Sequence, residues 1–107
     1  MYVRNLKVGE TKRVRARAAD AGENVPAFLQ PGSGGSPGTQ WSPVTGGIVT
    51  ALPIIPGEGE FCDFTGLAVG STLVDVHGIN ELGAPVSSQM QVNVTVGPAT
   101  HYNFEDA

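Results

Sequence analysis

The chain has 107 residues and a mass of 11.1 kDa, with 15 Gly, 8 Pro, one Cys and a formal charge of −4. This length suits one domain, because typical domains contain roughly 100–150 residues. A hydrophobic share of 40% with 15% charged residues excludes a disordered polyelectrolyte. The many Gly and Pro residues argue for turns rather than a helical bundle. A single thiol excludes an internal disulfide and a Cys-based zinc site, and no apolar window is long enough for a transmembrane helix.

Charge is distributed unevenly along the chain. Residues 1–17 hold all six basic residues and one acid, a net charge of +5, whereas residues 18–107 hold nine acids and no Lys or Arg. The acidity of the whole chain disfavours nucleic acid as a partner. The N-terminal residues lack the apolar core of a signal peptide, and Met1 favours a protein that is made and used inside a cell.

Alternation of apolar and polar residues predicts seven short strands. A Gly-, Ser- and Pro-rich loop over 20–38 separates the second strand from the third, which begins at Trp41 and is cut short by Pro43. The predicted strands are 2–8, 11–19, 41–43, 47–55, 60–67, 71–79 and 86–96, with turns at 56–59 and 80–85. This spacing is typical of a β-sandwich or barrel.

The second predicted strand carries Arg13, Arg15 and Arg17 on one face, while the intervening Val and Ala residues take the other. Three roles for these arginines are open. They could protect an exposed strand from edge pairing. They could pair with Glu60 or Asp63, because the second and fifth strands of an immunoglobulin-type sandwich are neighbours. They could also dock onto an acidic partner.

A modest apolar core is expected around Trp41, the only Trp of the chain. Phe64 and Cys62 share one strand face and are expected to flank it, with Cys62 acting as a small buried hydrophobic residue. The predicted core residues are Val14, Ala16, Trp41, Phe64, Val74, Val76, Val92 and Val94.

The sequence indicates no catalytic, cofactor-binding or metal-binding residues, so we do not expect an enzyme. Asp75 and His77 share a strand face, but no third ligand or nucleophile stands at a recognisable spacing. The glycines of 31–38 lack the Lys-Ser/Thr that follows a phosphate loop. The segment 20–24 (DAGEN) lacks the final glutamate of a calcium loop, and its residues are typical of an Asx turn.

Four stretches together form a recognisable pattern. They are LKVGETKRVRARAAD (6–20), Trp41 with Ser42, FTGLAVGSTLVDVHG (64–78) and QVNVTV (91–96). The first contains an apolar-x-x-Gly-Glu-Thr turn before an alternating strand, and in the third Gly70 precedes another. This order of segments resembles the bacterial immunoglobulin-like domains of the group 2 type, which occur in bacterial adhesins and phage virion proteins.

The resemblance implies an all-β fold, an immunoglobulin-like β-sandwich of about seven strands. The sandwich is expected over residues 1–96, with a short C-terminal extension over residues 97–107. In this family the segment corresponding to 6–20 forms an opening hairpin, and the residue corresponding to Trp41 is the core tryptophan.

The resulting hypothesis is a non-enzymatic phage structural protein that decorates the capsid or belongs to a head or tail appendage. Its expected partners are the major capsid protein or another virion protein, with a possible homo-oligomer and with neither nucleic acid nor a membrane. It would be made in the host cytoplasm and reside in the virion. The alternative is a carbohydrate- or cell-surface-binding immunoglobulin-like module at an extracellular surface. The candidate contact residues are Arg13, Arg15, Arg17, Tyr102 and Phe104.

Overall fold

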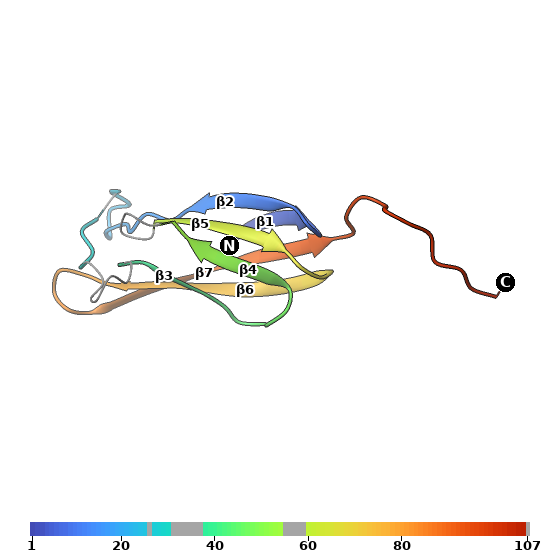
Figure 1. The fold of residues 1–107 in the computed structure, drawn as a ribbon. Coiled ribbons are helices and arrows are strands. Elements are labelled where there is room, and N and C mark those ends of the chain that lie inside the picture. Colours follow the sequence, from blue (N-terminus) through green and yellow to red (C-terminus); the bar gives the residue numbers. More distant parts are fainter. Residues whose placement is uncertain (26, 31–37, 55–59, 107) are drawn as a thin grey trace.

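The computed structural model describes residues 1–25, 27–30, 38–54 and 60–106. These residues form seven strands in two sheets, without a helix among them (Figure 1). The strands are β1 (Tyr2–Lys7), β2 (Thr11–Arg15), β3 (Gln40–Pro43), β4 (Val49–Pro53), β5 (Phe61–Gly66), β6 (Gly70–Ile79) and β7 (Pro85–Thr95). The predicted all-β, immunoglobulin-like sandwich of seven strands is therefore confirmed.

The two sheets differ from the constant-type immunoglobulin arrangement in the position of the first strand. One sheet has the order β1-β7-β6-β3 and the other the order β2-β5-β4. In the constant-type arrangement the first strand lies beside the second. Here β1 instead runs parallel to β7, with Tyr2 opposite Met90 and Lys7 opposite Thr95. The outer edge of β2 is consequently left without a neighbouring strand among the described residues.

The opening hairpin that the family resemblance implies over residues 6–20 is wrong, because β1 and β2 lie in opposite sheets. The turn between them carries the chain from one sheet to the other. Gly9 adopts φ +85°, which favours glycine. The Glu10 N–H donates to the Lys7 carbonyl at 3.0 Å, and the Glu10 carboxylate accepts a hydrogen bond from the Lys7 N–H at 3.1 Å. These contacts close the turn from both sides.

The second strand is shorter than the alternation predicts, because β2 ends at Arg15. The Ala16 N–H still donates to the Glu60 carbonyl at 2.7 Å. The chain then pairs locally, with the Ala18 carbonyl accepting a hydrogen bond from the Ala27 N–H at 2.7 Å. The alternation of apolar and polar residues over 11–19 therefore extends past Arg15, where β2 ends.

The fourth strand also begins later than the prediction of 47–55. It starts at Val49, because Gly46 and Gly47 form a turn before it. The predicted turn at 56–59 and residues 31–37 of the Gly-rich loop lie outside the described residues.

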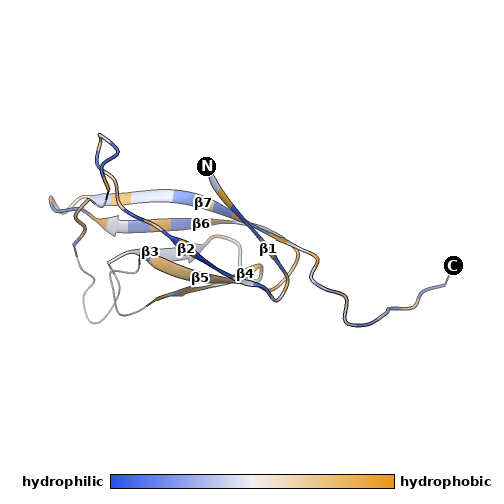
Figure 2. Ribbon diagram, turned by 90° about the horizontal axis from the view of Figure 1, so that it is seen from above, coloured by the Kyte–Doolittle hydropathy of each residue, from blue (hydrophilic) through white to orange (hydrophobic). Residues whose placement is uncertain are grey.

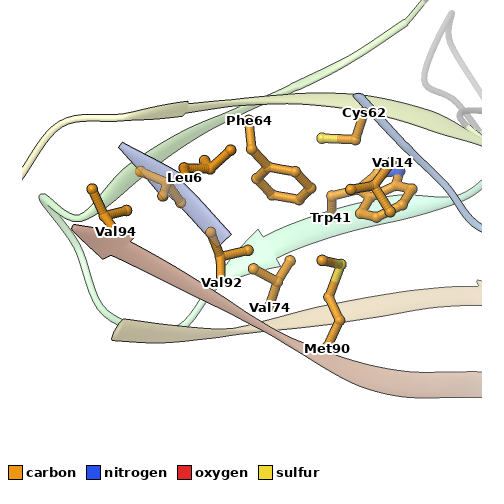
Figure 3. Close-up of a cluster of buried hydrophobic side chains, with 10 residues drawn as sticks. Leu6, Val14, Trp41, Cys62, Phe64, Val74, Met90, Val92 and Val94 are labelled. Atoms are coloured by element: carbon orange, nitrogen blue, oxygen red, sulfur yellow. The ribbon is translucent and has the colours of Figure 1, made fainter. Parts of the chain in front are cut away.

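The core lies between the two sheets and is centred on an aromatic pair (Figure 3). The rings of Trp41 and Phe64 meet edge to face, with centroids 5.8 Å apart and an interplanar angle of 72°. Six residues of the predicted core are buried, and Ala16 and Val76 are partly buried against them. The buried cluster also holds Leu6, Val49, Cys62 and Met90.

Candidate docking surfaces

Two of the three arginines on the second predicted strand form ion pairs within the molecule. Arg13 Nε donates to Asp63 Oδ1 at 2.8 Å, and its Nη2 lies 3.3 Å from Asp63 Oδ2. Arg15 Nη2 lies 3.2 Å from Glu60 Oε2, and its guanidinium stands 5.0 Å from the centre of the Phe61 ring. The antiparallel register of β2 and β5 produces these pairs, because it places Arg13 opposite Asp63.

These pairs show that one of the roles left open by the sequence, pairing within the molecule, is present for Arg13 and Arg15. The hydrogen bond from Arg13 holds the pKa of the Asp63 carboxyl below its ordinary value, and the same bond raises the pKa of the Arg13 guanidinium. Pairing within the molecule is thus observed for Arg13 and Arg15. Arg17, beyond the end of β2, forms no ion pair with any residue that the structure describes. Figure 2 shows how hydrophilic β2 is along most of its length.

An apolar groove of about 200 Å³ opens between the two sheets. One wall consists of residues 15–18, and the opposite wall consists of residues 86–90 at the start of β7. Trp41 and Val76 also line the groove, and Tyr2 lies at the point where β1 begins. We call this feature the β2–β7 groove and the surrounding part of the sandwich the open end.

The β2–β7 groove exists because β1 covers only part of β7. Pairing between the two strands begins at Tyr2 and Met90, so residues 85–89 have β6 on one side and no described strand on the other. The N-terminus accordingly lies about midway along the sandwich (Figure 1). The groove lies beyond the start of β1, between residues 15–18, at and after the end of β2, and the uncovered start of β7.

The opposite end of the sandwich is tightly closed, and we call it the closed end. Leu6 of β1 is 1% exposed there, beside the buried Val94. A Cβ atom added to Gly66 would lie 2.6 Å from the Lys7 carbonyl oxygen and 3.0 Å from Val94 Cγ1. The Gly9 N–H donates to the Gly66 carbonyl at 2.9 Å. β1 therefore seals the gap between the sheets along this half.

The C-terminal segment leaves the sandwich at the closed end and projects away from it (Figure 1). It follows β7 from Val96 onward and belongs to neither sheet. Tyr102 is 88% exposed and Phe104 is 96% exposed. The structure thus keeps these two predicted contact residues apart from the arginines, because Arg17 lies at the open end.

Asp75 and Asp20, which belong to two polar groups considered in the sequence, both accept hydrogen bonds within the molecule. Gln89 Nε2 donates to Asp75 Oδ1 at 2.6 Å, and His77 on the same face is exposed. Asp20 Oδ1 accepts hydrogen bonds from the Gly22 and Asn24 N–H groups at 2.9 and 3.0 Å, an Asx turn that lowers the pKa of the Asp20 carboxyl.

No three His, Cys, Asp or Glu side chains in the described part of the chain are placed to share a metal ion. Across the same residues, no helix has the length and apolarity needed to cross a membrane.

Burial raises the pKa of the Cys62 thiol to about 12, so it stays protonated and unreactive near neutral pH.

Comparisons with known proteins support the fold. Neither the family models nor the curated proteins that were searched contain a match. Domains 4 and 5 of the S-layer protein SbsC superpose with a TM-score of 0.63 and 16% identity, over 91% of this chain and 49% of that structure. The PKD domain of the KIAA 1837 protein gives a TM-score of 0.59 and 14% identity, over 94% of this chain and 89% of that one.

The similarity to these two structures concerns the fold alone, because the identities are low. Both are immunoglobulin-like domains, and the chain spans about half of the SbsC structure. The immunoglobulin-like fold is thereby established, whereas membership of the bacterial group 2 type stays a prediction.

The β2–β7 groove is the feature that sequence reasoning missed. The predicted strand 86–96 is clearly longer than the predicted strand 2–8. A mismatch of that kind leaves part of the longer strand uncovered if the two strands pair. The sequence, however, contains no pattern that identifies 2–8 as the neighbour of 86–96.

Proposed function

We propose that this protein is a non-enzymatic structural component of a phage virion that decorates the capsid or forms part of a head or tail appendage. The observation that carries the proposal is the C-terminal segment, on which Tyr102 and Phe104 are almost fully exposed. Clustered exposed apolar side chains mark interaction sites, and Tyr102 and Phe104 are two residues apart, of a type enriched at the centres of protein interfaces. The segment is therefore the docking element.

The rest of the molecule supports a binding role. The sandwich is a compact scaffold, and its Arg13 and Arg15 side chains are occupied by Asp63 and Glu60. The fold is shared with domains of an S-layer protein, a protein of a surface layer. The pattern of the segments around Trp41 resembles that of group 2 immunoglobulin-like domains in phage virions. These observations favour assembly on a protein surface over chemistry at a site.

The test is co-sedimentation of the purified protein with capsids that lack it. Stoichiometric binding is expected for the natural chain, with a large loss for the double variant Tyr102→Ala, Phe104→Ala. The matched control is His101→Ala, Asn103→Ala, which alters the alternate positions of the same segment and should bind normally. Absence of binding to capsids and to tails by the natural chain would overturn the proposal.

The carbohydrate-binding alternative needs aromatic rings on a common exposed face. Trp41 is buried, and Tyr102 and Phe104 lie on a segment outside the sheets. A glycan array without hits would remove this alternative, whereas selective glycan binding would favour it over the virion role.

A further inference from the structure

We propose that the C-terminal segment of one copy of this chain docks as an extended strand in the β2–β7 groove of a second copy, with Tyr102 and Phe104 in the groove. The closed end of one copy is thereby joined to the open end of the next. This inference rests on the proposed docking role of the segment and names its receptor.

The β2–β7 groove has the form of an unfilled strand position. It lies beyond the start of β1, between residues 15–18, at and after the end of β2, and the first residues of β7, which have no described strand on that side. A strand added at such a place can use main-chain hydrogen bonds for affinity and side-chain pockets for specificity. A volume of about 200 Å³ is below the roughly 300–1,000 Å³ of typical small-molecule pockets. The groove therefore suits a few side chains of a segment.

The C-terminal segment has the matching pattern of side chains. In an extended chain alternate residues point to the same side, so Tyr102 and Phe104 present both rings on one face. Asn103 lies between them, and together with the flanking His101 and Glu105 it takes the other face. Aromatic rings on one face complement a groove lined by apolar residues such as Trp41.

Charge favours the same pairing. Glu105 and Asp106 directly follow Phe104 in the segment. Arg17 lines the groove and forms no ion pair with a described residue, whereas the neighbouring Arg15 is paired with Glu60. An acidic segment end beside the Arg17 guanidinium gives complementary potentials, which steer and orient association.

The segment cannot place both of its aromatic rings in the groove of its own copy. From Met90, the near edge of the groove, to Thr95, β7 covers about 17 Å at the usual rise per residue. If the chain reversed at Gly97 and Pro98, the stretch from Pro98 to Tyr102 would span at most about 14 Å. Tyr102 would thus stop short even of the near edge. The occupant that fits the geometry is the segment of another copy.

The expected contact is weak in solution and reinforced by a lattice. Two aromatic side chains and a few backbone groups bury less than the roughly 1,200 Å² of a stable interface, so a Kd on the order of 100 µM is expected. On a virion surface neighbouring copies are held close together, which raises their effective concentration and the occupancy of the contact.

The first experiment is sedimentation equilibrium of the full chain up to about 1 mM, ten times the expected Kd. The natural chain should associate with increasing concentration, and the double variant Tyr102→Ala, Phe104→Ala should remain monomeric. The control His101→Ala, Asn103→Ala should associate as the natural chain does. A natural chain that stays monomeric throughout overturns the inference, as does equal association of both double variants.

The second experiment probes the groove directly through its own fluorophore. The Tyr102→Ala, Phe104→Ala chain serves as a folded receptor, and a synthetic peptide of residues 97–107 is titrated into it. Because Trp41 lines the groove, its emission should change with saturation, and a peptide carrying both alanines should leave it unchanged. Absence of a response to the natural peptide overturns the inference.

A charge exchange tests the direction of docking. Arg17→Glu and Glu105→Lys should each weaken self-association severalfold, and the two changes together should restore it. Failure of the combined variant to recover overturns the placement of Glu105 beside Arg17. If all self-association assays are negative while the aromatic variant still loses capsid binding, the inference fails and the proposed virion function stands.

Discussion

The two ends of the sandwich differ in how the gap between the sheets is covered. At the closed end β1 lies along β7, and Leu6 is sealed beside Val94. At the open end the same gap is lined by Trp41 and Val76, and none of the described strands crosses it, which leaves the β2–β7 groove. The described strands therefore cover the core fully at the closed end, whereas at the open end they leave a groove wide enough for an extended segment. A sandwich with an incomplete edge has a receptor for an extended segment built into its fold.

The largest effect on stability is expected from truncating a buried side chain at the closed end. Leu6→Ala should lower the free energy of unfolding by about 3 kcal/mol, because truncating a fully buried leucine leaves a cavity. Val76→Ala at the partly buried open end should cost about 1 kcal/mol. Urea denaturation of both variants measures the difference, and equal losses would show that the two ends are packed alike.

A matched pair of glycines provides the next test. Gly66→Ala should lower the free energy of unfolding by about 2 kcal/mol. The new methyl group would clash with the Lys7 carbonyl oxygen, a backbone atom that cannot move away as the end of a flexible side chain could. Gly78→Ala at the open end should cost less, since its Cβ would lie 3.1 Å from the Gly38 carbonyl oxygen and 3.4 Å from Leu29. Thermal denaturation compares them. A greater loss for Gly78→Ala would contradict the description of the closed end as the more rigid one.

Charge reversal should affect the free energy of unfolding more at the ion-paired Arg15 than at Arg17. Arg15→Glu should lower the free energy of unfolding by about 1 kcal/mol, because it places two carboxylates together and removes the stacking on Phe61. Arg17→Glu is the control and should leave stability nearly unchanged, since Arg17 has no described ion partner. Similar losses would show that Arg17 also contributes to the fold.

The smallest effect concerns pH. Asp63 and Asp20 both have lowered pKa values in the folded state, so the unfolded state takes up protons first as the solution is acidified. Their stabilisation is complete above the unfolded-state pKa of about 3.9 and is lost as the pH falls through the lower folded-state pKa. Asp63→Asn should flatten the dependence of urea midpoint on pH in this acidic range. An unchanged profile would show that the Arg13 pair is broken in solution.

Much of the fold could be predicted because alternation is a local property. The predicted strand 86–96 places Met90, Val92, Val94 and Val96 on one side, and the first three are buried in the structure. Val96 is 75% exposed, because β7 ends at Thr95. The pairing of Arg13 with Asp63 was among the predicted alternatives, because the order of strands in an immunoglobulin-type sandwich is known. The burial of Leu6 was harder to predict, because the first strand alternates weakly.

The sequence by itself determined the strand pattern, the central Trp41 and the inward and outward faces of most strands, since these depend on neighbours two residues apart. Only the tertiary structure decided that β1 lies beside β7, that the turn at Gly9 crosses between sheets and that a groove remains beside β2. The physical reason is that strand pairing joins residues far apart in the chain. The sheet that a first strand enters is selected by the packing of residues such as Leu6 against both sheets, and the local pattern contains no record of that choice.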